Sequence, residues 1–213
     1  MADLNRQVHG RPTTLGRTEA YVDEGLRSYM LRVYNYMASG VGITGIVAYL
    51  TFMFAVEQTG AGAQLTAFGT FLFTSPFKWV VMLAPLGMVF LLSARIGSMT
   101  TSGAQTAFWV FAGLMGLSLA SIFLVYAHGS IARVFFITAA AFGGLSLYGY
   151  TTKKDLSGWG SFLIMGLIGI ILASIVNIFL ASSALQFAVS VIGVLVFAGL
   201  TAYDTQRIKE MYF

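Results

Sequence analysis

Six long apolar runs limit what this chain can fold into. They lie at about residues 34–56, 77–95, 104–127, 131–151, 159–181 and 185–206. A helix needs roughly 20 mainly apolar residues to cross the hydrocarbon core of a bilayer, and each run is about that long. The runs do not alternate between apolar and polar residues, as the strands of a membrane β-barrel would. The sequence therefore predicts an all-α polytopic membrane protein with six spanning helices, and residues 57–69 are its longest predicted loop.

The composition agrees with a membrane protein and argues against several kinds of site. Charged residues make up 9% of the 213 residues and hydrophobic residues 57%, whereas a soluble domain carries about 25% charged residues. Cysteine is absent, and the two histidines lie far apart in sequence. We therefore expect no disulfide, no transition-metal site and no bound cofactor. The net charge of +4 is small, and we expect no nucleic-acid partner.

The distribution of lysine and arginine predicts the orientation. Ten of the 12 basic residues lie before the first run, at the end of the second, between the fourth and fifth, or after the sixth. Lys78 and Arg133 alone lie on the other side, near the starts of the second and fourth runs. The positive-inside rule then places the N-terminus and residues 207–213 in the cytoplasm. We predict a cytoplasmic N-terminal segment over residues 1–25, without a signal peptide, and a transmembrane domain over residues 26–213.

Two features of the runs concern packing. One apolar face is formed by Tyr29, Val33 and Tyr36, together with Leu26 and Met30. Two interpretations are open: an interfacial helix that precedes the first span, or an extension of that span. Small residues that let helices approach closely recur along three of the runs. These predicted packing faces comprise Ala112, Gly116 and Ala120 in the third run, Gly143 and Gly144 in the fourth, and Gly169, Ala173 and Asn177 in the fifth.

Two polar residues in the runs are candidates for function. Asn177 is a lone amide that we expect deep in the fifth span, where it either bonds to a neighbouring helix or lines a pore or cavity. Asp204 ends the sixth span, and we expect it in the last turn of a helix that stops near residue 206. Arg207 follows three residues later on the same face, and Arg95 is predicted at the same depth. Asp204 is either an interfacial carboxylate held by Arg207 or a titratable gate residue.

Several segments resemble one family. The segment "AYDTQRIKEMY" (202–212) resembles the signature that ends the sixth helix of the Bax inhibitor-1 family, also called the transmembrane Bax inhibitor motif family. The family's fifth and sixth helices are resembled by "SIVNIF" (174–179) and "SVIGVLVFAGLTAYDTQRIK" (190–209). The segment "LRSYMLRVYNYMASGVGITG" (26–45) resembles the entry into its first helix. The segment "APLGMVFLLS" (84–93) resembles the second helix of bacterial members. The resemblance covers the chain from about residue 25.

The resemblance implies a fold in which six helices surround a central seventh. It also implies a pair of aspartates, on helices six and seven, that sense protons and close a pore on the cytoplasmic side. Asp204 matches the first aspartate by motif, and Arg95 is the candidate for an arginine that latches to the charged pair. The sequence ends at Phe213, where the family would continue into its seventh helix, so we expect a chain truncated before that helix. Gly87 departs from members that carry an acidic residue in helix two.

The functional prediction is a pH-sensitive calcium leak channel of a bacterial inner membrane. The resemblance implies that Asp204 is its proton sensor, with Arg95 as the latch candidate and calcium as the permeant ion. The spacing to Asp204 makes Arg207 a second latch candidate. The alternative is a membrane-embedded regulator that conducts nothing and binds a membrane protease or another membrane protein. We do not expect an enzyme, because intramembrane aspartyl chemistry needs two carboxylates and the G-x-S-x-G pattern of serine hydrolases is missing.

Overall fold

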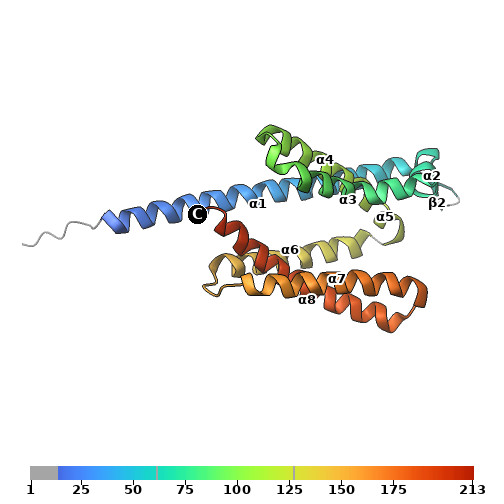
Figure 1. The fold of residues 1–213 in the computed structure, drawn as a ribbon. Helices are drawn as coiled ribbons and strands as arrows, with labels where there is room; N and C mark the ends of the chain where they lie inside the picture. Colours follow the sequence, from blue (N-terminus) through green and yellow to red (C-terminus); the bar gives the residue numbers. More distant parts are fainter. Residues whose placement is uncertain (1–13, 61, 127) are drawn as a thin grey trace, which may run out of the picture. The chain divides into compact units, whose positions relative to one another are not determined.

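The computed structural model describes residues 14–60, 62–126 and 128–213, with side chains from residue 23 onward. The helices are α1 (Thr14–Ala55), α2 (Ala67–Phe73), α3 (Phe77–Arg95), α4 (Thr101–Leu119), α5 (Ile122–Val125), α6 (His128–Thr151), α7 (Ser157–Leu180) and α8 (Ser183–Glu210) (Figure 1). A 3-10 turn, η1 (Ile96–Ser98), follows α3, and two strands, β1 (Val56–Thr59) and β2 (Gly62–Leu65), follow α1. Within the described ranges, six helical segments are long and apolar enough to cross a membrane. The predicted all-α polytopic fold is confirmed.

The chain divides into two compact units. Of the described residues, the terminal unit combines 14–33 with 138–213, and the central unit comprises those within 34–137. The predicted division at residue 25 does not coincide with a helix end, because α1 runs without interruption from Thr14 to Ala55. This continuity favours an extension of the first span over a separate interfacial helix.

The terminal unit contains the antiparallel pair α7 and α8, which lie side by side in Figure 1. A tight turn joins them at Ala181, whose φ of 48° is left-handed. The side chain of Ser182 accepts a hydrogen bond from the N–H of Leu185 and caps α8. A Cβ at Gly199 would lie 2.8 Å from the Leu163 side chain. Close approach between small and large residues therefore holds this pair together.

The small residues that make these contacts differ from those predicted for the fourth and fifth runs. A Cβ at Gly160 would lie 2.6 Å from the ring of Tyr203, and one at Gly149 would lie 2.4 Å from the carbonyl oxygen of Ala202. A Cβ at any of three predicted glycines, Gly143, Gly144 and Gly169, would meet no described atom within 4 Å. Within the terminal unit these three are not the packing positions, because α6 and α7 turn other faces toward α8.

In the central unit, α4 packs on α1 through the face predicted from its small residues. A Cβ at Gly116 would lie 2.7 Å from the carbonyl oxygen of Thr44, and the Thr44 hydroxyl donates a 2.9 Å hydrogen bond to the carbonyl of Ala112. Ala112 and Ala120 are both buried. This packing face is confirmed. The third run is nevertheless two helices, because α4 ends at Leu119 and α5 begins at Ile122.

The segment predicted as a long loop forms a β-hairpin followed by a short helix. Strands β1 and β2 pair antiparallel, with Val56 opposite Leu65. At the base of the hairpin, the N–H of Thr66 donates to the carbonyl of Ala55 at 2.9 Å, and the Thr66 hydroxyl caps α2 by accepting from the N–H of Gly69. The strands are four residues long, too short for an alternating pattern to stand out in the sequence.

Candidate functional site

The last two turns of α8 carry Asp204, the main candidate from the sequence. The helix ends at Glu210 and not near residue 206, so the prediction that Asp204 lies in the last turn is wrong. Arg207 and Lys209 occupy that last turn instead, where positive charge favours the negative end of the helix dipole. The helix continues beyond its apolar run because polar contacts with the rest of the terminal unit stabilise its final turns.

Two contacts fix the residues that precede Asp204. Ala202 lies against Gly149 of α6, and the Tyr203 ring lies against Gly160 of α7. Both glycines are buried, whereas Asp204 is exposed. Successive helical residues point about 100° apart, so packing of positions 202 and 203 on two neighbours leaves Asp204 on the side that neither covers.

Gln206 joins α8 to the α6–α7 connection, which we define as residues 152–156. Its Oε1 accepts a 2.7 Å hydrogen bond from the N–H of Leu156, and its Nε2 donates a 2.8 Å bond to the carbonyl of Lys154. Only 9% of Gln206 is exposed. Both ends of the amide are therefore used to hold one backbone segment, with geometry well inside the normal range.

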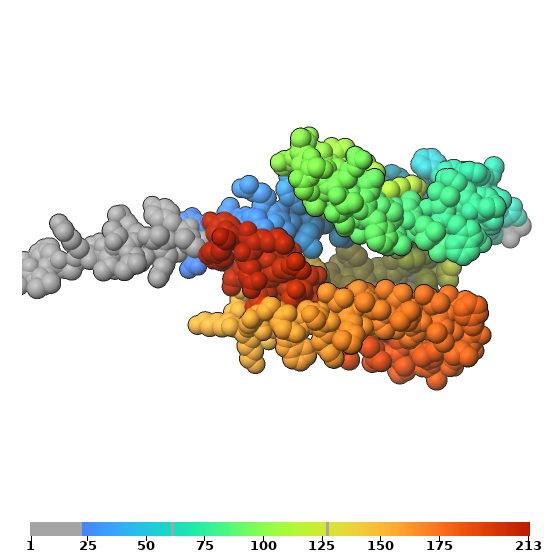
Figure 2. Space-filling view, viewed as in Figure 1, coloured from blue at the N-terminus to red at the C-terminus, as the bar shows by residue number. Residues whose placement is uncertain are grey.

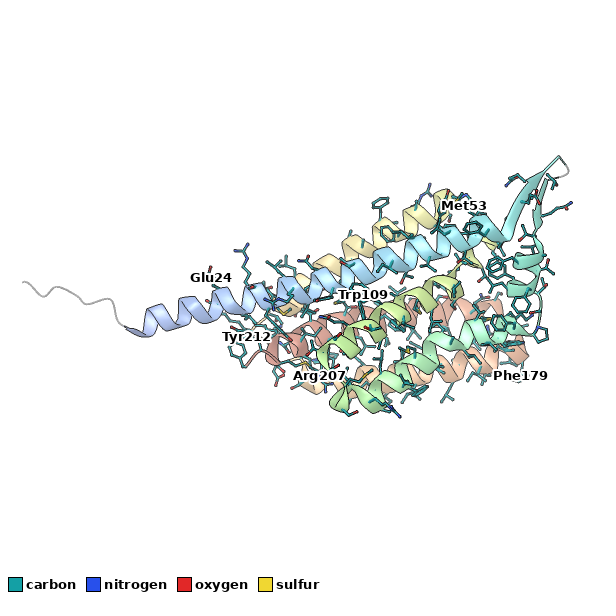
Figure 3. The ribbon with its side chains drawn as sticks, turned by 90° about the horizontal axis from the view of Figure 1, so that it is seen from above. Glu24, Met53, Trp109, Phe179, Arg207 and Tyr212 are labelled. Carbon is teal, nitrogen blue, oxygen red and sulfur yellow. The ribbon has the colours of Figure 1, made fainter. Side chains whose placement is uncertain are left out.

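Lys209 and Tyr212 extend this contact surface toward the end of the chain. The Nζ of Lys209 donates a 2.9 Å bond to the carbonyl of Tyr150 and lies 5.3 Å from the centre of the Tyr150 ring. Tyr212 stacks at a tilt on Tyr29 of α1, with ring centroids 5.5 Å apart, and fills the space beside Gly25. Figure 2 shows this end of α8 against the early part of α1, and Figure 3 shows Tyr212 and Arg207 at the opposite end of the unit from Phe179.

A second carboxylate, Asp155, lies in the α6–α7 connection. Its Oδ1 accepts hydrogen bonds from the hydroxyl and the N–H of Ser157, the first residue of α7. These bonds, the hydroxyl bond first, lower the pKa of Asp155 from its ordinary 3.8. Asp155 thus forms a local turn that leads into α7, and the neighbouring Lys153 and Lys154 are exposed.

The other predicted site residues lie in different places. Arg207 is exposed one turn beyond Asp204, and its charge attracts the Asp204 carboxylate. Arg95 ends α3 with an exposed side chain. It belongs to the central unit and Asp204 to the terminal unit, so the latch between them stays a prediction.

Asn177 is not deep in its span, contrary to the prediction. Because α7 ends at Leu180, Asn177 lies in its last turn. Its Oδ1 accepts a 2.9 Å bond from the N–H of Ser182, and its carbonyl accepts from Ala181. These two bonds close the α7–α8 turn, which is a structural use of the amide.

The chemistry available at this end of α8 is that of two titratable carboxylates, Asp204 and Glu210, among basic groups. Among the described residues, no group of three His, Asp or Glu side chains could hold a metal ion. One turn before Gly149, the Ser146 hydroxyl is buried and finds no hydrogen-bond partner in the described part of the chain. The arrangement can gain or lose a proton at Asp204 and change the local charge.

Sequence reasoning missed Gln206, Lys209, Tyr150 and Tyr203. The signal that could have found them is their place in the "AYDTQRIK" segment and at the end of the fourth run. Gln206 and Lys209 lie three residues apart, on one helical face. That face differs from the one that carries Asp204 and Arg207. Polar residues that continue a helix past its apolar run indicate that the face that carries them, here the face of Gln206 and Lys209, contacts another segment of the protein.

Comparison with known proteins bears on this segment as well as on the fold. The family model described as "Inhibitor of apoptosis-promoting Bax1" matches residues 26–213, which include α8 and its polar end. The chain belongs to the Bax inhibitor-1 family. Membership confirms the resemblance noted from the sequence.

Bacterial relatives support the same assignment. The chain is 49% identical to the uncharacterized protein RP147 of Rickettsia prowazekii over 94% of its own length and 80% of the relative's. It is 46% identical to the inner membrane protein YbhL of Escherichia coli, over 88% of its own length and 76% of the relative's. No solved structure matches the chain significantly. With six apolar helices and an inner membrane relative, this Bax inhibitor-1 protein is a multi-pass membrane protein in a lipid bilayer.

Proposed function

We propose that this Bax inhibitor-1 protein is a pH-sensitive calcium leak channel of a bacterial inner membrane, with Asp204 as its proton-sensing group. The observation that carries the proposal is the placement of Asp204. It is an exposed carboxylate that directly follows the apolar run of a spanning helix, and its flanking residues are fixed on α6, α7 and the connection between them. An ionisable residue on a spanning helix is a candidate for function because its charge is costly there.

The fixed surroundings support a sensor. Arg207 attracts the charged carboxylate, and protonation of Asp204 removes that attraction. Protonation shifts the equilibrium between two conformations only by as much as the proton affinity of Asp204 differs between them. A difference of one pKa unit corresponds to about 1.4 kcal/mol, enough to change a balanced population severalfold. In this proposal the N-terminus and residues 207–213 are cytoplasmic, as the distribution of basic residues predicts.

The test is calcium flux into liposomes that contain the purified protein, measured from pH 5 to pH 8. The proposal expects flux above that of protein-free liposomes and a change in flux across this range. Flux equal to that of empty liposomes at every pH would contradict it and leave the non-conducting regulator of a membrane protease or other membrane protein as the remaining function. The flux measurement should use the full-length natural protein.

A further inference from the structure

We propose that Gln206 is a positioning residue that holds the end of α8 on the α6–α7 connection and so fixes the place of Asp204. This inference deepens the proposed function, on which the importance of Asp204 rests. Its experiments nevertheless read out the contact and the titration of Asp204 without a flux measurement. The failure of one proposal is thus distinguishable from the failure of the other.

The geometry gives Gln206 two bonds to one short backbone segment. The amide accepts from the N–H of Leu156 and donates to the carbonyl of Lys154, which are 50 and 52 residues away in sequence. A side-chain amide is neutral and carries both a donor and an acceptor. These bonds are therefore present whether Asp204 is charged or neutral, and they oppose a movement of this end of α8 away from the connection.

Neighbouring contacts act in the same direction. The Nζ of Lys209, three residues after Gln206, bonds to the carbonyl of Tyr150 at the end of α6. The Cβ of Thr205, one residue before Gln206, would lie 3.0 Å from a Cβ at Gly149. A helix whose residues are attached at 205, 206 and 209 cannot rotate about its axis there. The backbone of Asp204, two residues before Gln206, is fixed with it.

Besides α7, three elements contact the end of the chain from α8 onward: α6, the α6–α7 connection and α1. Within two residues of these contacts, the charged and titratable groups other than Asp204 are Tyr203, Arg207, Lys209, Glu210 and Tyr212 at the end of the chain, Tyr148 and Tyr150 on α6, Lys153, Lys154 and Asp155 in the connection, and Asp23, Glu24, Arg27 and Tyr29 on α1. The α7 helix carries no charged residue. If the last turns of α8 detach, Asp204, Arg207 and Lys209 move together, away from the charged and titratable groups of the other elements. The pH at which Asp204 titrates should then change.

The first experiment tests the contact itself. A nitroxide spin label is attached at Lys153→Cys, an exposed position in a chain without other cysteines. Gln206→Met removes both hydrogen bonds and keeps much of the side-chain volume. Gln186→Met is the matched control, because Gln186 is an exposed glutamine at the other end of α8. The label should become more mobile in Gln206→Met and stay unchanged in Gln186→Met.

A third variant keeps the test informative if the apolar replacement folds poorly. Gln206→Glu retains an acceptor for Leu156 but, when ionised, has no donor for the carbonyl of Lys154. The label should be mobile at neutral pH and immobile again once the glutamate is protonated, a response that the wild-type chain lacks. A label that stays as immobile in the substituted chains as in the wild type would overturn the proposed contact.

The second experiment tests positioning. The carboxyl band of Asp204 is followed by infrared spectroscopy as the pH is changed, and it is assigned by its loss in Asp204→Asn. The titration midpoint should move by about half a pH unit or more in Gln206→Met and stay in place in Gln186→Met. An unchanged midpoint in a chain whose label has become mobile would overturn the positioning role. Absence of calcium flux in the wild type would overturn the channel alone.

Discussion

Gly149 of α6 approaches Ala202 of α8 so closely that a Cβ at residue 149 would lie 2.4 Å from the carbonyl oxygen of Ala202. The obstacle is backbone, which cannot rotate away as a side chain can. Glycine at 149 is therefore what allows α6 and α8 to meet two residues before Asp204. This contact therefore fixes the position of the end of α8 relative to α6.

Gly149→Ala should destabilise the protein by about 1–3 kcal/mol, because the two helices must separate to admit the methyl group. The measurement is the free energy of unfolding in mixed micelles. Gly144→Ala is the matched control, since it lies on the same helix and a Cβ there would meet no described atom within 4 Å. The control should be neutral or stabilising by up to about 1 kcal/mol, as alanine favours a helix over glycine. Equal effects of the two substitutions would contradict the contact.

The spanning helices could be predicted from the sequence because each one needs a long uninterrupted apolar run. The face of Ala112 and Gly116 was also predictable, because their four-residue spacing forms one stripe on a helix. In α6 and α7 the same argument chose glycines that do not contact α8. Spacing shows which residues share a face, but it does not show which face meets a neighbour.

The site was predictable only at Asp204, where a charge interrupts an apolar pattern. Gln206 was not predicted, because an amide near a helix end has no distinctive pattern. Its partners are backbone groups of Lys154 and Leu156, and a backbone group leaves no trace in the side-chain sequence. The β-hairpin was missed for a related reason, since its short strands depend on pairing with each other.

Ser146 and Ser182 should respond differently to replacement by alanine. The buried hydroxyl of Ser146 has no partner among the described residues, so its removal relieves a desolvation cost and should be neutral or slightly stabilising. Ser182 caps α8 by accepting from the N–H of Leu185, and Ser182→Ala should lower the free energy of unfolding by about 1 kcal/mol. Unfolding in mixed micelles measures both. Strong destabilisation by Ser146→Ala would mean that its hydroxyl has a partner.

Ser157→Ala should raise the pKa of Asp155 toward its ordinary 3.8, because the hydroxyl bond is the larger of the two effects that lower it. A lowered folded-state pKa stabilises the protein above the ordinary value, and this contribution is lost as the pH falls below 3.8 toward the folded-state pKa. Carbon NMR of the Asp155 carboxyl measures the shift. Ser174→Ala is the control, since the Ser174 hydroxyl donates within α7 to Ile170. An unmoved titration in Ser157→Ala would exclude the bond.

The orientation prediction can be tested with single cysteines, because the chain has none. Lys153→Cys lies in the α6–α7 connection and Gln58→Cys in the hairpin, and both native side chains are exposed. The positive-inside rule places residue 153 in the cytoplasm and residue 58 on the opposite side. An impermeant maleimide added to whole cells should label residue 58 and spare residue 153 until the membrane is opened. The reverse pattern would invert the proposed topology.

Asp204→Asn should flatten the pH dependence of calcium flux. Asparagine has nearly the shape of the neutral acid but cannot ionise, so the attraction to Arg207 is absent at every pH. The substituted protein should therefore stay at one flux level from pH 5 to pH 8, where the wild type changes. Glu210→Gln is the matched control, because it removes an exposed carboxylate at the end of the same helix, and it should retain the wild-type response. A pH profile in Asp204→Asn that follows the wild type would remove Asp204 from the sensor, even if the protein conducts calcium.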